Sequence, residues 1–103
     1  MSARVAAIRS LLQAALAPSG LAVEDDSHHH AGHAGAAGGA GHFTVRIVSE
    51  RFAGLPLLAR HRLVYQSVAP LMSTEIHALA IVAQTPAEAA RAAAPGESLT
   101  TTR

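Results

Sequence analysis

Histidine is the residue type in this sequence that most clearly offers chemistry. The chain has seven histidines among 103 residues, and five of them lie between positions 28 and 42. A neutral imidazole is the commonest metal ligand in proteins, and it titrates near physiological pH. Three consecutive histidines occupy positions 28–30, and His33 follows closely. The pattern favours metal binding, and the alternative for His28 and His29 is sequence drift in a tolerant loop.

Two histidines outside this cluster are further candidates. His77 stands immediately before a predicted strand, where it could be a ligand or a partly buried imidazole bonded to a backbone carbonyl. His61 falls in the apolar stripe of a predicted helix, which is typical of a core or interface histidine.

Other chemistry finds little support in the residues. Cysteine is absent, which excludes disulfides, a thiol nucleophile and any thiolate metal site built by this chain alone. No P-loop, GxGxxG, HExxH or GxSxG motif is present. Asp25 and Asp26 end a predicted strand, where they solvate a turn more readily than they form an acid–base pair. We therefore expect a protein that is not an enzyme.

The basic residues are eight arginines against seven carboxylates, a net charge of +1. This balance is not typical of binding nucleic acid through bulk charge. Arg60 and Arg62 lie about 200° apart on a helix, so we interpret them as solvated charge rather than one patch. The chain shows no signal peptide and no run of ~18 apolar residues that a membrane span needs. The expectation is a cytoplasmic protein.

The elements that position these residues follow from periodicity in the first half of the chain. Residues 3–17 carry apolar positions three and four apart after Ser2, which predicts an amphipathic helix with Ser2 as its N-cap. Residues 21–26 and 43–48 alternate apolar and polar, which predicts a hairpin of two strands. Residues 28–41 between them consist only of His, Ala and Gly, and we expect a mobile loop there.

The second half gives a helix, a strand and a helix. A turn at 52–54 leads to Pro56 at a helix start, and an apolar stripe follows at Leu57, His61, Val64, Val68 and Leu71, with Pro70 kinking or ending the helix. Residues 78–84 read as a strand, and 85–88 form a capping box for a helix that continues to Ala94.

This order predicts one α+β domain over residues 1–94, with a flexible C-terminal tail at 95–103. Its three-stranded sheet has helices packed on one face in α-β-β-α-β-α order.

Three motifs resemble the BolA family in the family's order and spacing. They are FTVRIV at 43–48 followed by Ser49-x-Arg51-Phe52-x-Gly54, then Arg60-His61-Arg62-Leu63-Val64, and then Ile76-His77-Ala78-Leu79 with Thr85-Pro86 beyond. The resemblance runs from about residue 4 to residue 90. It implies a fold similar to class II KH domains, in agreement with the element order.

The resemblance also implies a partner, a monothiol glutaredoxin with a CGFS motif, and a [2Fe–2S] cluster shared with it. The family's histidine at the third strand matches His77, and its loop ligand matches His30, for which His33, His29 or His28 could substitute. Two imidazoles can replace two thiolates on one iron, so the glutaredoxin cysteine and glutathione would supply the other half. We expect a labile cluster, no cofactor tightly bound to the isolated chain, and a monomer or weak homodimer without the partner.

Two other functions remain open. The resemblance also implies a DNA-binding transcriptional regulator that uses a KH-like surface, with Arg46, Arg51, Arg60 and Arg62 as contacts. The chain has no GxxG loop and few aromatic rings for stacking, which ranks this function second. Storage of copper, nickel or zinc by the histidine loop needs no partner and predicts binding that survives loss of His77.

Overall fold

The computed structural model describes residues 2–27 and 40–93. Residues 28–39 of the predicted mobile loop and the predicted tail at 95–103 lie outside the described residues. Gly41, which the sequence placed in the loop, is the first residue of a strand.

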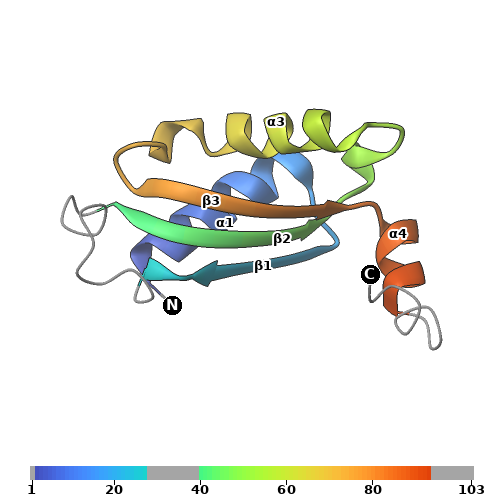
Figure 1. Cartoon of the computed structure of the whole chain (residues 1–103), viewed down its shortest axis with the longest axis horizontal. Coiled ribbons are helices and arrows are strands. Elements are labelled where there is room, and N and C mark those ends of the chain that lie inside the picture. Colours follow the sequence, from blue (N-terminus) through green and yellow to red (C-terminus); the bar gives the residue numbers. More distant parts are fainter. Residues whose placement is uncertain (1, 28–39, 94–103) are drawn as a thin grey trace.

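The chain forms a three-stranded sheet with helices before, between and after its strands (Figure 1). In chain order the elements are α1 (Ala3–Leu16), β1 (Gly20–Asp25), β2 (Gly41–Val48), the 3-10 helix η2 (Glu50–Phe52), α3 (Leu57–Ser67), the 3-10 helix η3 (Ala69–Leu71), β3 (Ile76–Gln84) and α4 (Pro86–Ala93). β2 is the central strand, antiparallel to β1 and parallel to β3. The predicted hairpin and the α-β-β-α-β-α order are confirmed.

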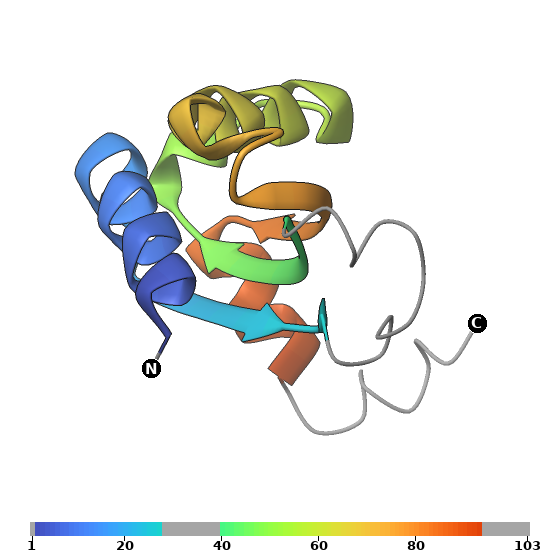
Figure 2. The same ribbon diagram turned by 90° about the vertical axis from the view of Figure 1, so that its left-hand side faces the viewer.

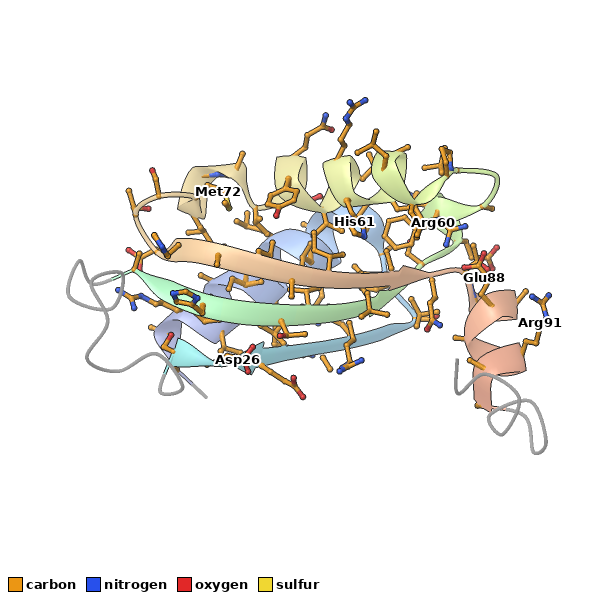
Figure 3. All side chains as sticks on the ribbon, viewed as in Figure 1. Asp26, Arg60, His61, Met72, Glu88 and Arg91 are labelled. Atoms are coloured by element: carbon orange, nitrogen blue, oxygen red, sulfur yellow. The ribbon has the colours of Figure 1, made fainter. Side chains whose placement is uncertain are left out.

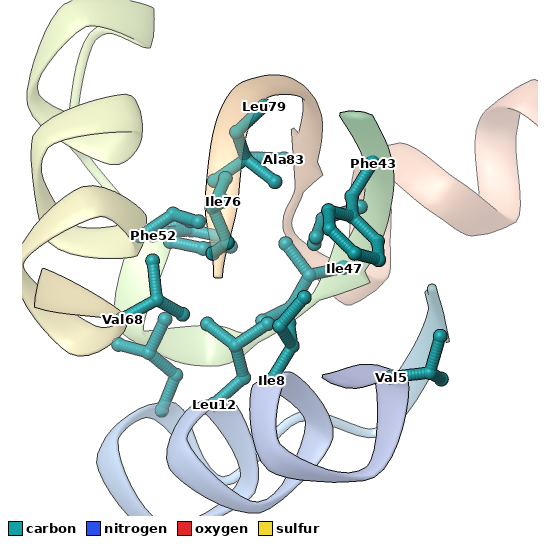
Figure 4. Packing of buried hydrophobic residues seen from close by; sticks show 13 residues of the cluster. Val5, Ile8, Leu12, Phe43, Ile47, Phe52, Val68, Ile76, Leu79 and Ala83 are labelled. Atoms are coloured by element: carbon teal, nitrogen blue, oxygen red, sulfur yellow. The ribbon is translucent and has the colours of Figure 1, made fainter. Parts of the chain in front are cut away.

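The hydrophobic core lies between one face of the sheet and the helices α1 and α3. Figure 2 shows both helices on the same side of the sheet, which leaves the other face uncovered by them. The strand β2 alternates as predicted, with Phe43, Val45 and Ile47 at most 2% exposed. Figure 4 shows Ile8 and Leu12 of α1 reaching toward Ile47. The core is aliphatic apart from two phenylalanines, because the chain has few aromatic residues.

Helix α1 forms where the sequence predicts it. The Ser2 hydroxyl accepts a hydrogen bond from the Val5 amide at 3.1 Å, so it caps the helix. The helix buries one stripe of residues: Val5, Ile8, Leu12 and Leu16. It ends at Ala17, whose backbone is left-handed (φ 43°) just before Pro18.

Helix α3 differs from its predicted stripe. Val64 and Val68 are fully buried, but Leu57 is 63% exposed and His61 and Leu71 are only half-buried. The side chain that turns inward in the first turn is Arg60, at 8% exposed. The helix ends at Ser67, before Pro70, as the proline predicts.

Helix α4 continues from the end of β3 and projects away from α3 (Figure 1). Its predicted capping box is confirmed: the Glu88 amide donates to Thr85 Oγ1 at 3.2 Å, and the Thr85 amide donates to Glu88 Oε1 at 3.0 Å. None of its residues is buried. The packing of helices on one sheet face is therefore carried by α1 and α3.

Candidate metal-ligating site

His77 lies inside β3, not before it, because the strand begins at Ile76 rather than at the predicted residue 78. Gly41 of β2 pairs with Ile76, whereas the next residue, His42, pairs with Ala78. His77 is therefore an extra residue in β3 at this point. Such an insertion breaks the two-residue alternation and re-aims a side chain. Ile76 and Leu79 are both buried, while His77 is exposed.

A second imidazole lies beside His77. The ring centres of His42 and His77 are 5.0 Å apart, and the ring planes are tilted by 51°. His42 belongs to the histidine-rich stretch of the sequence, but the sequence alone predicts no role for it. Only the pairing of β2 with β3 brings the two residues together, and the strand pattern of a single sequence does not reveal that register.

The backbone at His42 is held by β1 and by the turn before β3. The Asp26 amide donates to the His42 carbonyl at 2.7 Å, and the His42 amide donates to Ser27 Oγ at 3.1 Å. The Gly41 amide donates to the Glu75 carbonyl at 3.0 Å. A Cβ at Gly41 would come within 2.5 Å of Ser27 Oγ and 2.8 Å of the Phe43 ring, so a larger residue here would have to displace one of these side chains. The start of β2 is thus fixed in place.

Asp25 and Asp26, near this site, have the structural roles in the turn that the sequence predicts. Asp25 Oδ1 accepts a hydrogen bond from the Ser27 amide at 2.9 Å, and Asp26 Oδ2 accepts one from the Thr44 hydroxyl at 2.6 Å. These bonds close the end of the hairpin. Asp26 stands beside β1 in Figure 3.

The other histidines lie either outside the described residues or elsewhere in the fold. His28, His29, His30 and His33 lie outside the described residues. His61 lines a groove of about 640 Å³ with Leu57 and with residues 81–84 at the far end of β3. Within residues 2–27 and 40–93, no three His, Asp or Glu side chains come close enough to hold a metal ion.

The four arginines proposed as DNA contacts do not form one surface. Arg46 is exposed on β2 between the buried Val45 and Ile47, so it lies on the sheet face opposite to the core. Arg62 is exposed on α3, and α3 covers the core face. Arg51 is exposed, and one of its nitrogens donates to the Ala15 carbonyl at 3.3 Å. Arg60 is buried, so its interpretation as solvated charge is wrong.

Arg60 is buried because it has a partner for its charge. Its Nη1 and Nη2 lie 2.6 and 2.9 Å from the two carboxylate oxygens of Glu88, and the two side chains point toward one another in Figure 3. Nε also donates to the Leu55 carbonyl at 2.8 Å, and Nη1 to that of Ala83 at 3.1 Å. The hydrogen bond from Arg60, with that from the Thr85 amide, lowers the pKa of Glu88 to about 2.

The architecture defines a small α+β domain in which one mixed sheet carries two helices on one face and an imidazole pair at the start of β2 and β3. The chain belongs to the BolA-like protein family, whose model matches residues 12–88. Proteins of this family are not enzymes.

Individual relatives agree with this assignment. The chloroplastic protein BOLA1 of Arabidopsis thaliana is 47% identical over 88 residues, which cover 82% of this chain and 55% of the relative. The DNA-binding transcriptional regulator BolA of Escherichia coli is 43% identical over 74 residues, 72% of this chain and 68% of the relative. The solved BolA domain of SufE1 from Arabidopsis matches with a TM-score of 0.75 and 44% identity, over 85% of this chain and 98% of that domain.

The chain is shorter than many of its relatives. It spans 23% to 59% of the length of the Arabidopsis and mammalian proteins it matches. Among the described helices, none is long and apolar enough to cross a membrane.

Proposed function

We propose that this chain is an adapter in iron–sulfur and iron homeostasis, which binds a monothiol CGFS glutaredoxin and shares a labile [2Fe–2S] cluster with it. The observation that carries the proposal is the exposed His77, held on a strand beside a second imidazole. The donor set fits the chemistry. A chain without cysteine offers imidazole ligands only, so the thiolates come from the glutaredoxin cysteine and glutathione.

His77 is the first proposed ligand and His30 the second, with His33 and His29 as substitutes. The fixed start of β2 supports this pairing. Ser27 bonds to the His42 amide, and the His42 ring is next to His77. His30 follows Ser27 by three residues, a span of at most about 11 Å. The chain's connectivity therefore keeps His30 within reach of this corner of the sheet.

Imidazole ligation suits cluster delivery or sensing. An imidazole can be protonated and displaced more easily than a thiolate, so a cluster held partly by histidine is labile. We expect the free chain to be a monomer or weak homodimer without a tightly bound cofactor. The cytoplasm is the compartment we propose for it.

The test is anaerobic reconstitution of the chain with a monothiol glutaredoxin, iron, sulfide and glutathione. Absorption, circular dichroism and the mass by size exclusion would be compared for the unaltered chain, His77→Ala and His30→Ala. His61→Ala is the matched control, since that ring lies at the far end of β3. We expect a coloured one-to-one heterodimer whose spectra change with either ligand variant and not with the control.

Other outcomes have distinct meanings. A spectral change with His77→Ala alone would reassign the second ligand to His33 or His29, which the corresponding variants would identify. A glutaredoxin that keeps its own homodimeric cluster in the presence of this chain would overturn the adapter function.

A second candidate is a DNA-binding transcriptional regulator, as the Escherichia coli relative is named. Because Arg60 is committed to Glu88, the remaining candidate contacts are Arg46, Arg51 and Arg62. Since Arg46 and Arg62 lie on opposite faces, one DNA-binding surface can include only one of these two. Fluorescence anisotropy with duplex DNA tests this function. Weaker binding of Arg46→Ala and a shallower salt dependence would support it, and unchanged binding would remove Arg46 as a contact.

A further inference from the structure

The distance between the rings of His42 and His77 allows both imidazoles to bind one metal ion. A zinc–nitrogen bond is 2.0–2.1 Å, and the ring centre lies roughly 1.1 Å beyond the nitrogen. Two rings on one ion are therefore about 5.2 Å apart at a tetrahedral angle and about 4.5 Å apart at a right angle. The observed distance between the ring centres, 5.0 Å, falls between these values.

Both rings are mounted on strands rather than on a loop. The backbone of His42 is held by hydrogen bonds to Asp26 and Ser27, and the register places it opposite Ala78, the neighbour of His77. Ligands on rigid elements lose little freedom when a metal binds, which favours affinity. An imidazole also has two nitrogens, so one can coordinate while the other keeps a hydrogen bond to the protein.

The surroundings leave room for the remaining ligand positions. His77 is exposed and His42 is half-buried, so water can reach an ion placed between the rings. The nearby carboxylates are engaged, Asp26 by the Thr44 hydroxyl and Glu75 by Arg4 at 2.7 Å. Such a site has two protein ligands and open positions for water.

We propose that the free chain binds one imidazole-preferring divalent ion, such as Zn²⁺, between His42 and His77. This site is separate from the loop histidines and needs no glutaredoxin. His77 is also the proposed ligand of the shared cluster, so the ion and the cluster partner compete for it. Occupancy by the mononuclear ion then keeps the chain from accepting a cluster.

The experiment uses the full chain with His28, His29, His30 and His33 all replaced by asparagine, which removes competing loop ligands. Zn²⁺ is titrated while the imidazole ¹⁵N signals are followed by NMR and the heat by calorimetry. We expect one equivalent to shift the signals of His42 and His77 together and to leave His61 unchanged. In this background His42→Asn and His77→Asn should each weaken binding at least tenfold, and His61→Asn should not.

Amide spectra of each variant confirm that the fold is retained before binding is compared. Absence of Zn²⁺ binding in the four-substituted chain, or binding that His42→Asn leaves unchanged, overturns the site. Because no glutaredoxin is present, that result is independent of the reconstitution that tests the adapter function. Zn²⁺ that slows cluster uptake by the four-substituted chain only when both His42 and His77 are present would establish the competition.

Discussion

Arg60 near the start of α3 and Glu88 in the first turn of α4 meet through two parallel hydrogen bonds of 2.6 and 2.9 Å. Glu88 also accepts a hydrogen bond from the Thr85 amide in the capping box, at the junction of β3 and α4. The same carboxylate therefore caps α4 and neutralises the buried charge of Arg60. Since α4 buries none of its own residues, this pair is a main attachment of α4 to the domain.

Replacement of Glu88 should change how stability depends on pH. The folded chain holds the pKa of Glu88 near 2, below its ordinary value of 4.5. A depressed pKa contributes stability that is fully present above about pH 4.5 and is lost as pH falls toward 2. Denaturant unfolding at several pH values should show Glu88→Gln less stable than the unaltered chain at pH 6, with the difference shrinking below pH 4. A difference that stays constant down to pH 2 would contradict this account.

Arg60→Ala should lower the thermal midpoint clearly more than Arg62→Ala. The first substitution removes the Arg60 hydrogen bonds to the carbonyls of Leu55 and Ala83 and leaves the Glu88 carboxylate with the Thr85 amide as donor but without its cation. Loss of a partner by a buried polar group is costly. Arg62, two residues along the same helix, is exposed, so its removal should change little. Calorimetry of the two variants measures the contrast, and equal midpoints would mean that the pair does not stabilise the fold.

Ser49→Ala should destabilise the chain by about 1–3 kcal/mol. The Ser49 hydroxyl is 1% exposed, donates to the Leu16 carbonyl at 2.6 Å and accepts from the Arg51 amide at 3.1 Å. It therefore ties the end of α1 to the end of β2. Ser67→Ala is the control, because the Ser67 hydroxyl donates to the Leu63 carbonyl within its own helix. Urea unfolding should show a larger loss of stability for Ser49→Ala than for Ser67→Ala. Equal losses would contradict a stabilising role of the Ser49 hydroxyl between α1 and β2.

Ala17→Gly should stabilise the chain by roughly 0.5–1 kcal/mol, since a left-handed backbone is costly for alanine and not for glycine. Ala17 has φ 43° at the end of α1. Ala14→Gly, at an exposed position inside the same helix, should instead destabilise by about 1 kcal/mol. We expect the urea midpoint to rise for Ala17→Gly and to fall for Ala14→Gly. A lower midpoint for both variants would mean that the left-handed backbone of Ala17 is not strained.

Local signals in the sequence predicted much of the fold. The stripe at Val5, Ile8 and Leu12, the alternation along β2 and the Thr85–Glu88 capping box each depend on residues within a few positions, and all three were right. The resemblance that supplied His77 likewise rested on short motifs.

The errors arose where distant segments meet. Arg60 reads as exposed charge until Glu88, 28 residues later, is placed beside it. The orientation of His77 depends on one extra residue in β3 relative to β2, which alternation within a single strand does not reveal. His42 gained a role only from the pairing of the two strands.

The hydrogen bonds that join Asp26 and Ser27 to His42 also determine how well this domain tolerates changes in the length of the connection between β1 and β2. These hydrogen bonds, made by Asp26, Ser27 and His42 themselves, hold the ends of β1 and β2 together. Each doubling of a closed flexible segment costs only about 0.6 kcal/mol in entropy. We therefore expect that residues between Ser27 and Gly41 can be lengthened or replaced in this chain while β1 and β2 remain paired, so that a foreign peptide inserted here would lie next to His77.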